Sequence, residues 1–83
     1  MDLQWHDKAW DDYLYWQSQD KKTTKKINAL VKAIRRNERL GHMEILKSDY
    51  AGWRSTRIDQ ANRLIFKVSD NVLTVASCRG HYE

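Results

Sequence analysis

The chain lacks several features that would mark a larger or more elaborate protein. It has one cysteine, no proline and three glycines among 83 residues. A single cysteine excludes an internal disulfide framework and any zinc site built from several thiolates. With no proline, low-complexity tract or internal repeat to divide the chain, its length predicts a single domain over residues 1–83.

Long hydrophobic runs are missing as well. No apolar stretch approaches the roughly 18 residues that a membrane-spanning helix requires. The opening residues, MDLQWHDK, do not combine a basic segment with an apolar one, so we expect no signal peptide. We therefore expect a cytoplasmic protein with no membrane partner, kept reduced. Cys78, at the end of an apolar run, is then expected to be a small buried thiol.

Acidic residues are absent from one stretch of the chain. The formal net charge is +4. Seven Lys or Arg and no Asp or Glu lie between Lys21 and Arg36, whereas five aspartates fall in the first twenty residues. Such asymmetry favours a polyanionic partner, most often a nucleic acid. The alternative is an ordinary solvated helix face.

The first half of the chain has helical patterning. LQW near the start alternates as a short strand would, and from Asp7 the spacing becomes helical. His6 or Asp7 can cap this first helix. Its expected apolar stripe has the spacing i, i+3, i+4, i+7: Trp10, Tyr13, Leu14 and Gln17.

A second helix is predicted after a short turn. Asp20 is its expected N-cap, and Gly41 provides a left-handed conformation beyond its end. Its apolar stripe contains Ile27, Leu30, Val31 and Ile34.

The second half has the patterning of strands. WRSTRI, RLIFKV and VLTVASC are rich in β-branched and aromatic residues, and DQAN and SDN separate them as hairpin turns would. The expected order is strand, helix, helix and a three-strand antiparallel meander, with HMEILK as a loop before the meander. We predict an α+β fold with two helices on one face of a small, mainly antiparallel sheet. The other face is then open for function.

The meander brings polar residues to one edge of this sheet. Arg57 ends the first meander strand and Arg63 starts the second, while Arg79 and His81 follow the third. We therefore expect the final residues CRGHYE to approach the two arginines, although a frayed terminus is the alternative. Glu44, among apolar neighbours in HMEILK, would have a raised pKa if partly buried and could act as a base; the alternative is a surface glutamate.

Such a set suits RNA cleavage without a cofactor. RNA carries its own nucleophile, the 2′-OH, so cleavage needs a base, an acid and cations that hold the charge on phosphorus. Glutamate, histidine and arginine meet these needs. The sequence shows no paired metal-ligand motif and no glycine loop that cradles phosphates. This pattern alone is not specific, because any basic domain contains some of these residues.

Five motifs in order carry a resemblance that covers nearly the whole chain. WDDYLYW, KKIN, GWRSTRI, RLIF and CRGHY together resemble the YoeB toxins of the RelE superfamily. The resemblance implies a RelE-like fold and a bacterial toxin of a type II toxin–antitoxin system. It also implies an endoribonuclease that cleaves mRNA in the ribosomal A site and so inhibits translation. The expected partner is a YefM-type antitoxin with an acidic, partly disordered segment. Members of the family often form homodimers, but the sequence leaves the oligomeric state of this chain open, since an exposed aromatic patch is suggested only by Trp10, Tyr15 and Trp16.

The resemblance also implies roles for individual residues. Glu44 corresponds to the general base, Arg63 to the arginine on the scissile phosphate, His81 to the general acid and Tyr82 to the residue that stacks on or orients a base. Lys47 and Arg57 correspond to basic positions expected to contact RNA or the ribosome. Arg79, which follows the third meander strand, is a further residue expected to bind RNA. The chain departs from the family at three positions: Ile45 replaces a proline, Gly80 replaces a bulkier aromatic, and Glu83 adds a residue after the usual terminal tyrosine.

Two other functions fit parts of the sequence. A non-catalytic basic module that binds RNA or the ribosome needs the cations but has no use for Glu44 or His81. A gyrase-directed toxin on the same fold is a second alternative, because fold does not fix function. That branch lacks the Glu, Arg and His-Tyr set.

Overall fold

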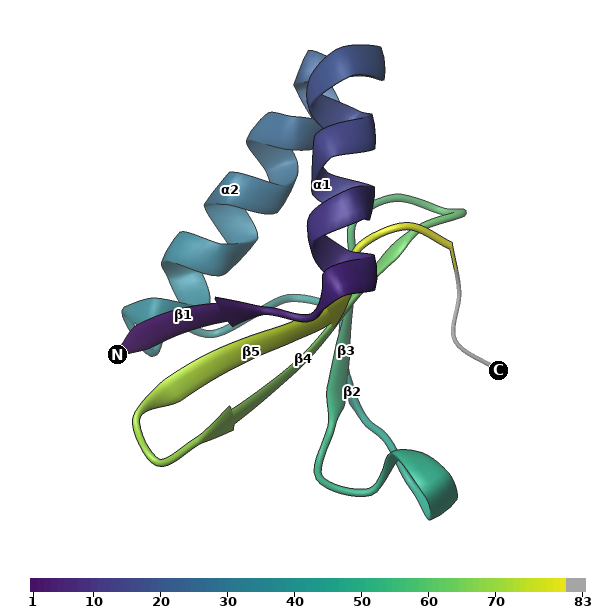
Figure 1. Ribbon diagram of the computed structural model, residues 1–83. Coiled ribbons are helices and arrows are strands. Elements are labelled where there is room, and N and C mark those ends of the chain that lie inside the picture. The colour runs from purple at the N-terminus through teal and green to yellow at the C-terminus, as the bar shows by residue number, and fades with distance from the viewer. Residues whose placement is uncertain (81–83) are drawn as a thin grey trace.

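The computed structural model describes residues 1–80 and forms two helices and five strands in the order that Figure 1 traces by colour. The elements, with a single 3₁₀ turn η1, are β1 (Asp2–Trp5), α1 (Asp7–Gln19), α2 (Lys21–Arg35), β2 (Met43–Ile45), η1 (Ser48–Tyr50), β3 (Arg54–Arg57), β4 (Arg63–Ser69) and β5 (Val72–Ser77).

The strands form one sheet in the order β1-β5-β4-β3-β2. β1 pairs with β5 in parallel, and the other neighbours are antiparallel. Both helices cover the same side of the sheet (Figure 1). The predicted α+β fold, with its mainly antiparallel sheet and two helices on one face, is confirmed.

The segment predicted as a loop, HMEILK, instead contains strand β2. Met43 pairs with Thr56, Glu44 with Ser55 and Ile45 with Arg54 in antiparallel register. The sequence does not reveal this strand because all three of its residues are exposed, so burial imposes no alternation on it. Ile45 retains a backbone N–H at the position where the resemblance led us to expect proline.

Helix α2 begins as predicted. Asp20 accepts hydrogen bonds from the backbone N–H groups of Lys22 and Thr23, at 3.1 and 3.2 Å, and from the Thr23 hydroxyl at 2.8 Å. These bonds satisfy donors that the first helical turn leaves without partners. The predicted stripe Ile27, Leu30, Val31 and Ile34 is buried. No helix within residues 1–80 is long and apolar enough to cross a membrane.

Helix α1 presents a different face from the one predicted. Trp10 and Leu14 are 45% and 44% exposed, whereas Ala9 and Asp12 are buried. Small Ala9 lets the helix lie close to the sheet, and Asp12 is buried because it accepts hydrogen bonds from the end of β5. His6 occupies the N-cap position, and its side chain makes no capping hydrogen bond.

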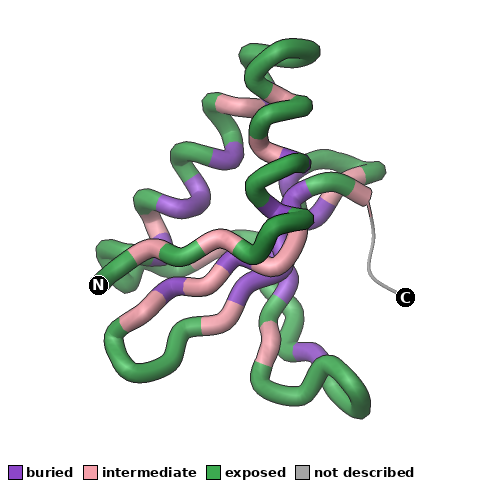
Figure 2. Tube along the Cα trace, in the orientation of Figure 1, coloured by how far each residue is buried: buried purple, intermediate pink, exposed green. Residues whose placement is uncertain are grey.

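The core lies between α2 and strands β4 and β5, where Figure 2 shows buried positions facing each other. Leu64 and Phe66 of β4 pack in one cluster with Leu73 and Val75 of β5, and Cys78 belongs to it. Cys78 is the buried thiol predicted. Asp70 and Asn71, both at positive φ, make the two-residue hairpin turn between the strands.

Candidate active site

Arg63 is the centre of a polar cluster on the sheet. Its side chain is only 10% exposed, although it carries a charge. Nε donates to the hydroxyl of Ser55, and Nη2 donates to the backbone carbonyl of His42 at 3.3 Å. Nη2 also lies 3.6 Å from Oε1 of Glu44. These contacts compensate the burial of the charge and fix the plane of the guanidinium.

Strand register explains why these three side chains meet. Ser55 lies opposite Glu44 on one side and Ile65 on the other. Side chains of directly paired residues project from the same face of a sheet. Leu64 and Phe66, which alternate with Arg63 and Ile65 along β4, belong to the core beneath the helices. The cluster of Glu44, Ser55 and Arg63 is therefore on the sheet face opposite the helices.

Glu44 lies on the surface, which is one of the two alternatives that the sequence left open. Its side chain is 57% exposed, since β2 is the last strand of the sheet and no further strand covers it. Its carboxylate combines access to solvent with proximity to the Arg63 guanidinium. The condition for a desolvated base, partial burial among apolar neighbours, is therefore not met, and the alternative of a surface glutamate is correct.

Two predicted cations accompany this cluster. Arg57 is the direct partner of Arg63 across β3 and β4, and it is exposed. Lys47, also exposed, follows β2 and precedes η1. Glu44 pairs with Ser55 midway along β3, so Arg57 and Lys47 lie toward opposite ends of the cluster. Arg57 shares the face of the cluster, because it is directly paired with Arg63.

The end of the described chain returns to Arg63, as the predicted meander requires. The backbone N–H of Arg63 donates to the carbonyl of Gly80 at 3.1 Å. The predicted residues His81 and Tyr82, together with Glu83, lie outside the described residues, and their approach to the arginines stays a prediction. Gly80 has a φ of 86°, a conformation that favours glycine over the aromatic expected from the resemblance.

Arg79 is not brought together with Glu44 and Arg63. The central carbon of its guanidinium lies 3.5 Å from the centroid of the Tyr15 ring on α1. This is a cation–π contact across to the helix. Its predicted role in RNA binding stays a prediction.

Sequence reasoning missed three residues of this region. Each accepts a hydrogen bond: Ser55 from the Arg63 side chain, Asn62 from the Gly80 backbone N–H and Asp12 from the Cys78 backbone N–H. The sequence contains one usable indication for Asp12, a lysine four residues before it on the same helix. Nothing comparable distinguishes Ser55 or Asn62 from ordinary strand and turn residues.

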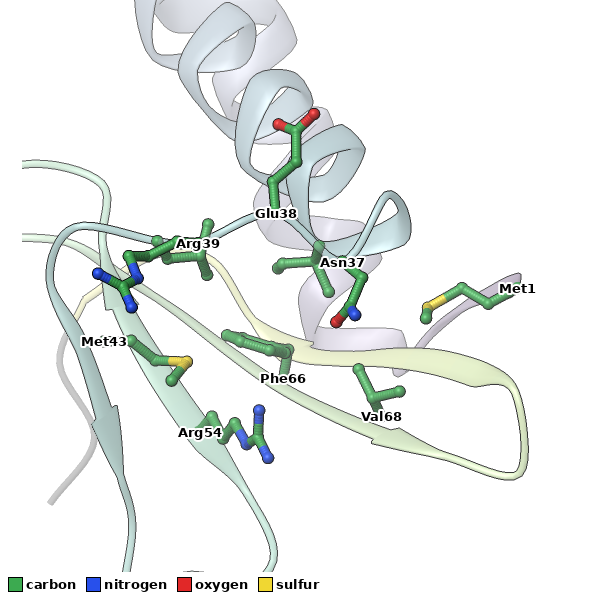
Figure 3. A pocket seen from close by; sticks show the side chains of 10 residues that line it. Met1, Asn37, Glu38, Arg39, Met43, Arg54, Phe66 and Val68 are labelled. Atoms are coloured by element: carbon green, nitrogen blue, oxygen red, sulfur yellow. The ribbon is translucent and has the colours of Figure 1, made fainter.

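A hollow of about 470 Å³ lies elsewhere, on the helix side of the sheet. Figure 3 shows its wall of strand residues, among them Met43, Arg54 and Phe66, facing the segment that follows α2. None of Glu44, Ser55 and Arg63 lines it. This hollow is thus separate from the polar cluster around Arg63, and the two lie on opposite faces of the sheet.

The polar cluster holds one carboxylate and one guanidinium rather than a set of metal ligands. Residues 1–80 contain no group of three or more His, Cys, Asp or Glu side chains placed to hold a metal ion. A guanidinium fork beside a carboxylate fits a phosphodiester with an adjacent hydroxyl, because it supplies donors for the phosphate oxygens and an acceptor for a proton.

Comparison with known proteins decides the family. Residues 5–82 match the model of the YoeB-like toxin of bacterial type II toxin–antitoxin systems. The chain belongs to the YoeB family of type II toxins. Toxin YoeB of Escherichia coli strain K12 is 48% identical over 84 residues, which span 99% of this chain and 100% of the relative. The predicted resemblance is confirmed.

Solved YoeB structures share this fold. A YoeB/ParE toxin from Agrobacterium tumefaciens is 41% identical, with a TM-score of 0.94 and coverage of 99% of this chain and 100% of the other. A chain from a YoeB–YefM complex of Staphylococcus aureus is 42% identical, with a TM-score of 0.90 and coverage of 99% and 98%.

Proposed function

We propose that this YoeB-family toxin is an endoribonuclease that cleaves mRNA in the ribosomal A site and so inhibits translation. The observation that carries the proposal is the Glu44–Arg63 pair on the open sheet face. Its guanidinium is buried and fixed, its carboxylate is accessible, and the described end of the chain is hydrogen-bonded to the same arginine. Family membership supports the toxin role, and the cluster supports the chemistry.

Each group has a part in one transesterification. Glu44 takes the proton of a 2′-OH, whose oxygen attacks the adjacent phosphorus. The bond from phosphorus to the 5′-oxygen breaks, and His81 donates a proton to that oxygen. The products are a 2′,3′-cyclic phosphate and a 5′-hydroxyl. No water or redox partner is consumed in this step.

Arg63 stabilises the charge that develops on the phosphate. A guanidinium held by Ser55 and the His42 carbonyl does not need to reorganise when the charge appears, which is the condition for efficient electrostatic catalysis. Tyr82 stacks on or orients a base beside the cleaved bond, since single-stranded RNA is recognised through its exposed base faces. Lys47 and Arg57 bind neighbouring phosphates.

The partner that silences the toxin is a YefM-type antitoxin. An acidic segment that folds on contact neutralises the cations around Arg63 and covers the site near His81. A structure of the complex checks this. If the partner occupies only a remote surface, such as the hollow beside Met43 and Phe66, the covering model fails.

The deciding experiment is cleavage of an mRNA programmed into ribosomes, with primer extension mapping the new ends. We expect a cut within the A-site codon and a loss of about 10²-fold or more in rate for His81→Ala, which removes the general acid. Cleavage at the same rate in the variant contradicts the role of His81. Binding to ribosomes without any cleavage favours the non-catalytic binding module instead.

A parallel DNA supercoiling assay with gyrase tests the second alternative. We expect no inhibition, because the Glu44–Arg63 pair suits RNA chemistry and is of no evident use against gyrase. Inhibition of gyrase without ribosome-dependent cleavage overturns the proposal.

A further inference from the structure

The backbone just after β5 is held more firmly than a chain end requires. Strand β5 finishes at Ser77, yet the next residues are tied to α1. Oδ2 of Asp12 accepts from the Cys78 N–H at 3.1 Å, and the Trp16 indole N–H donates to the Cys78 carbonyl at 2.9 Å. Both backbone polar groups of Cys78 therefore bond to side chains of one helix.

A second support comes from the β3–β4 turn. Oδ1 of Asn62 accepts from the Gly80 N–H at 2.8 Å, and the Arg63 N–H donates to the Gly80 carbonyl at 3.1 Å. Asn62 is itself oriented, because its amide nitrogen donates to Oδ1 and Oδ2 of Asp59 at 3.0 and 3.2 Å. Residues 78–80 are thus held from two sides by elements far apart in the sequence.

The burial of Asp12 has no explanation in core packing. A carboxylate on the buried face of a helix loses hydration, and an apolar residue would fit such a position at lower cost. Here the carboxylate is paired with Lys8 at 2.7 Å and is aimed at the Cys78 backbone. The buried carboxylate is explained if the position of residues 78–80, which it fixes through a hydrogen bond, matters more than the packing of the helix.

Arg63 shows why that placement matters. Its guanidinium belongs to the cluster with Glu44, while its own backbone N–H bonds to the residue before His81. We propose that Asp12 and Asn62 are positioning residues that set where the chain leaves for His81 relative to the Arg63 guanidinium. This inference rests on the proposed ribonuclease function and extends it to two residues that touch neither substrate nor reacting atoms.

The size of the effect follows from positional tolerance in catalysis. Chain ends are poorly ordered unless something ties them down. A displacement of about 1 Å in a catalytic group can reduce a rate by about 10²-fold. Removing either acceptor weakens one of these supports. The rate constant of cleavage is therefore expected to fall by about 10- to 100-fold, with little change in ribosome affinity.

The test uses single-turnover cleavage on programmed ribosomes at increasing toxin concentration. Asn62→Ala and Asp12→Ala remove one acceptor each. Asp11→Ala is the matched control for Asp12, since Asp11 is the exposed neighbour on the same helix. We expect the maximal rate to fall for the first two variants, the half-saturating concentration to stay constant, and the control to behave as the parent.

A reciprocal exchange provides a rescue. Asn62→Asp alone places two carboxylates side by side, whereas Asp59→Asn combined with Asn62→Asp restores both the contact between the two side chains and the acceptor for Gly80. We expect the single change to be slow and the exchange to recover most of the rate. Thermal unfolding and hydrogen exchange at the Gly80 N–H separate loss of the support from loss of the fold.

The outcomes distinguish the two proposals. If the parent cleaves and both alanine variants cleave equally fast, the positioning role is overturned while the ribonuclease function stands. Loss of rate that tracks global unfolding and is not recovered by the exchange also overturns it. If the parent itself does not cleave, the ribonuclease proposal fails, and the positioning role fails with it.

Discussion

At the scale of a single residue, Arg63 makes two separate contacts, one through its side chain and one through its backbone. Its side chain sits beside Glu44, and its main chain ties down Gly80. A substitution changes the first contact and leaves the second in place. Side-chain variants of Arg63 therefore test the phosphate-binding role without releasing the end of the chain.

Arg63→Lys is expected to lower the cleavage rate by about 10²-fold or more, comparable with the loss of one oxyanion donor. Lysine keeps the charge and loses the planar fork that bonds to Ser55 and that is proposed to bind the substrate phosphate. Single-turnover cleavage on ribosomes measures the effect. Arg54→Lys is the matched control, because Arg54 precedes Ser55 on β3 and lines the hollow on the other face. Equal losses in both variants contradict the assignment.

Cys78 is expected to be unreactive in the folded protein. Burial, and secondarily the negative charge of Asp12, raises the pKa of its thiol from 9.0 to about 12. The thiolate is the reactive form, so a thiol reagent at pH 8 should label Cys78 only after denaturation. The unfolded chain loses this proton near pH 9 and the folded chain does not, so this group's contribution to stability declines between pH 9 and about 12. Rapid labelling of native protein is the contrary result.

At the scale of elements, the predictions succeeded where one residue type sets a local rule. The Asp20 cap of α2 was predictable, because a short side chain with a hydrogen-bond acceptor is preferred at the N-cap directly before an amphipathic helix. The stripe of α2 was readable because its apolar residues share one face and its cations take the others. RLIFKV was likewise recognisable as a strand from its β-branched and aromatic residues, and Leu64 and Phe66 of β4 lie in the core.

Other elements were not predictable, because tertiary contacts decide them. In α1 the aromatic residues suggested a stripe through Trp10 and Leu14, but the burial of Asp12 depends on the end of β5, 66 residues later. Strand β2 forms because β3 offers it a free edge, and its three exposed residues have no pattern of their own. Of the site, the resemblance named Glu44 and Arg63, while Ser55 emerged only from strand register.

The N-cap of α2 predicts a pH-dependent change in stability. Hydrogen bonds from the Thr23 hydroxyl and then from the Thr23 backbone lower the pKa of Asp20 from 3.8. The folded state therefore favours the carboxylate, and its contribution is present above pH 3.8 and lost as the pH falls through the lower folded value. Asp20→Ala should lower the melting temperature at pH 7 and do so less below pH 3.8. Asp11→Ala is the control, and a difference independent of pH contradicts the argument.

At the scale of the whole molecule, positive charge occurs on two separate surfaces. The cations of α2 are exposed on the helix layer, while the Glu44–Arg63 cluster lies across the sheet. Under the proposed function, we expect the α2 cations to contact the RNA of the ribosome and the cluster to engage the mRNA strand.

The salt dependence of ribosome binding should show whether the lysines of α2 contact phosphates. Changing Lys21, Lys22, Lys25 and Lys26 to Gln is expected to reduce the slope of log affinity for ribosomes against log salt by about 3 if all four contact phosphates. The cleavage rate at saturation should hardly change. Asp7→Asn with Asp11→Asn alters the net charge away from α2 and serves as the control. An unchanged slope would mean that these lysines contact solvent and no phosphate.

The parallel pairing of β1 with β5 also bears on how the domain folds. Asp2 pairs with Val72 and Trp5 with Val75, so this pairing joins segments 70 residues apart in the sequence. Pairings so distant in sequence form late. We therefore expect the local β4–β5 hairpin to form first and β1 to complete the sheet last.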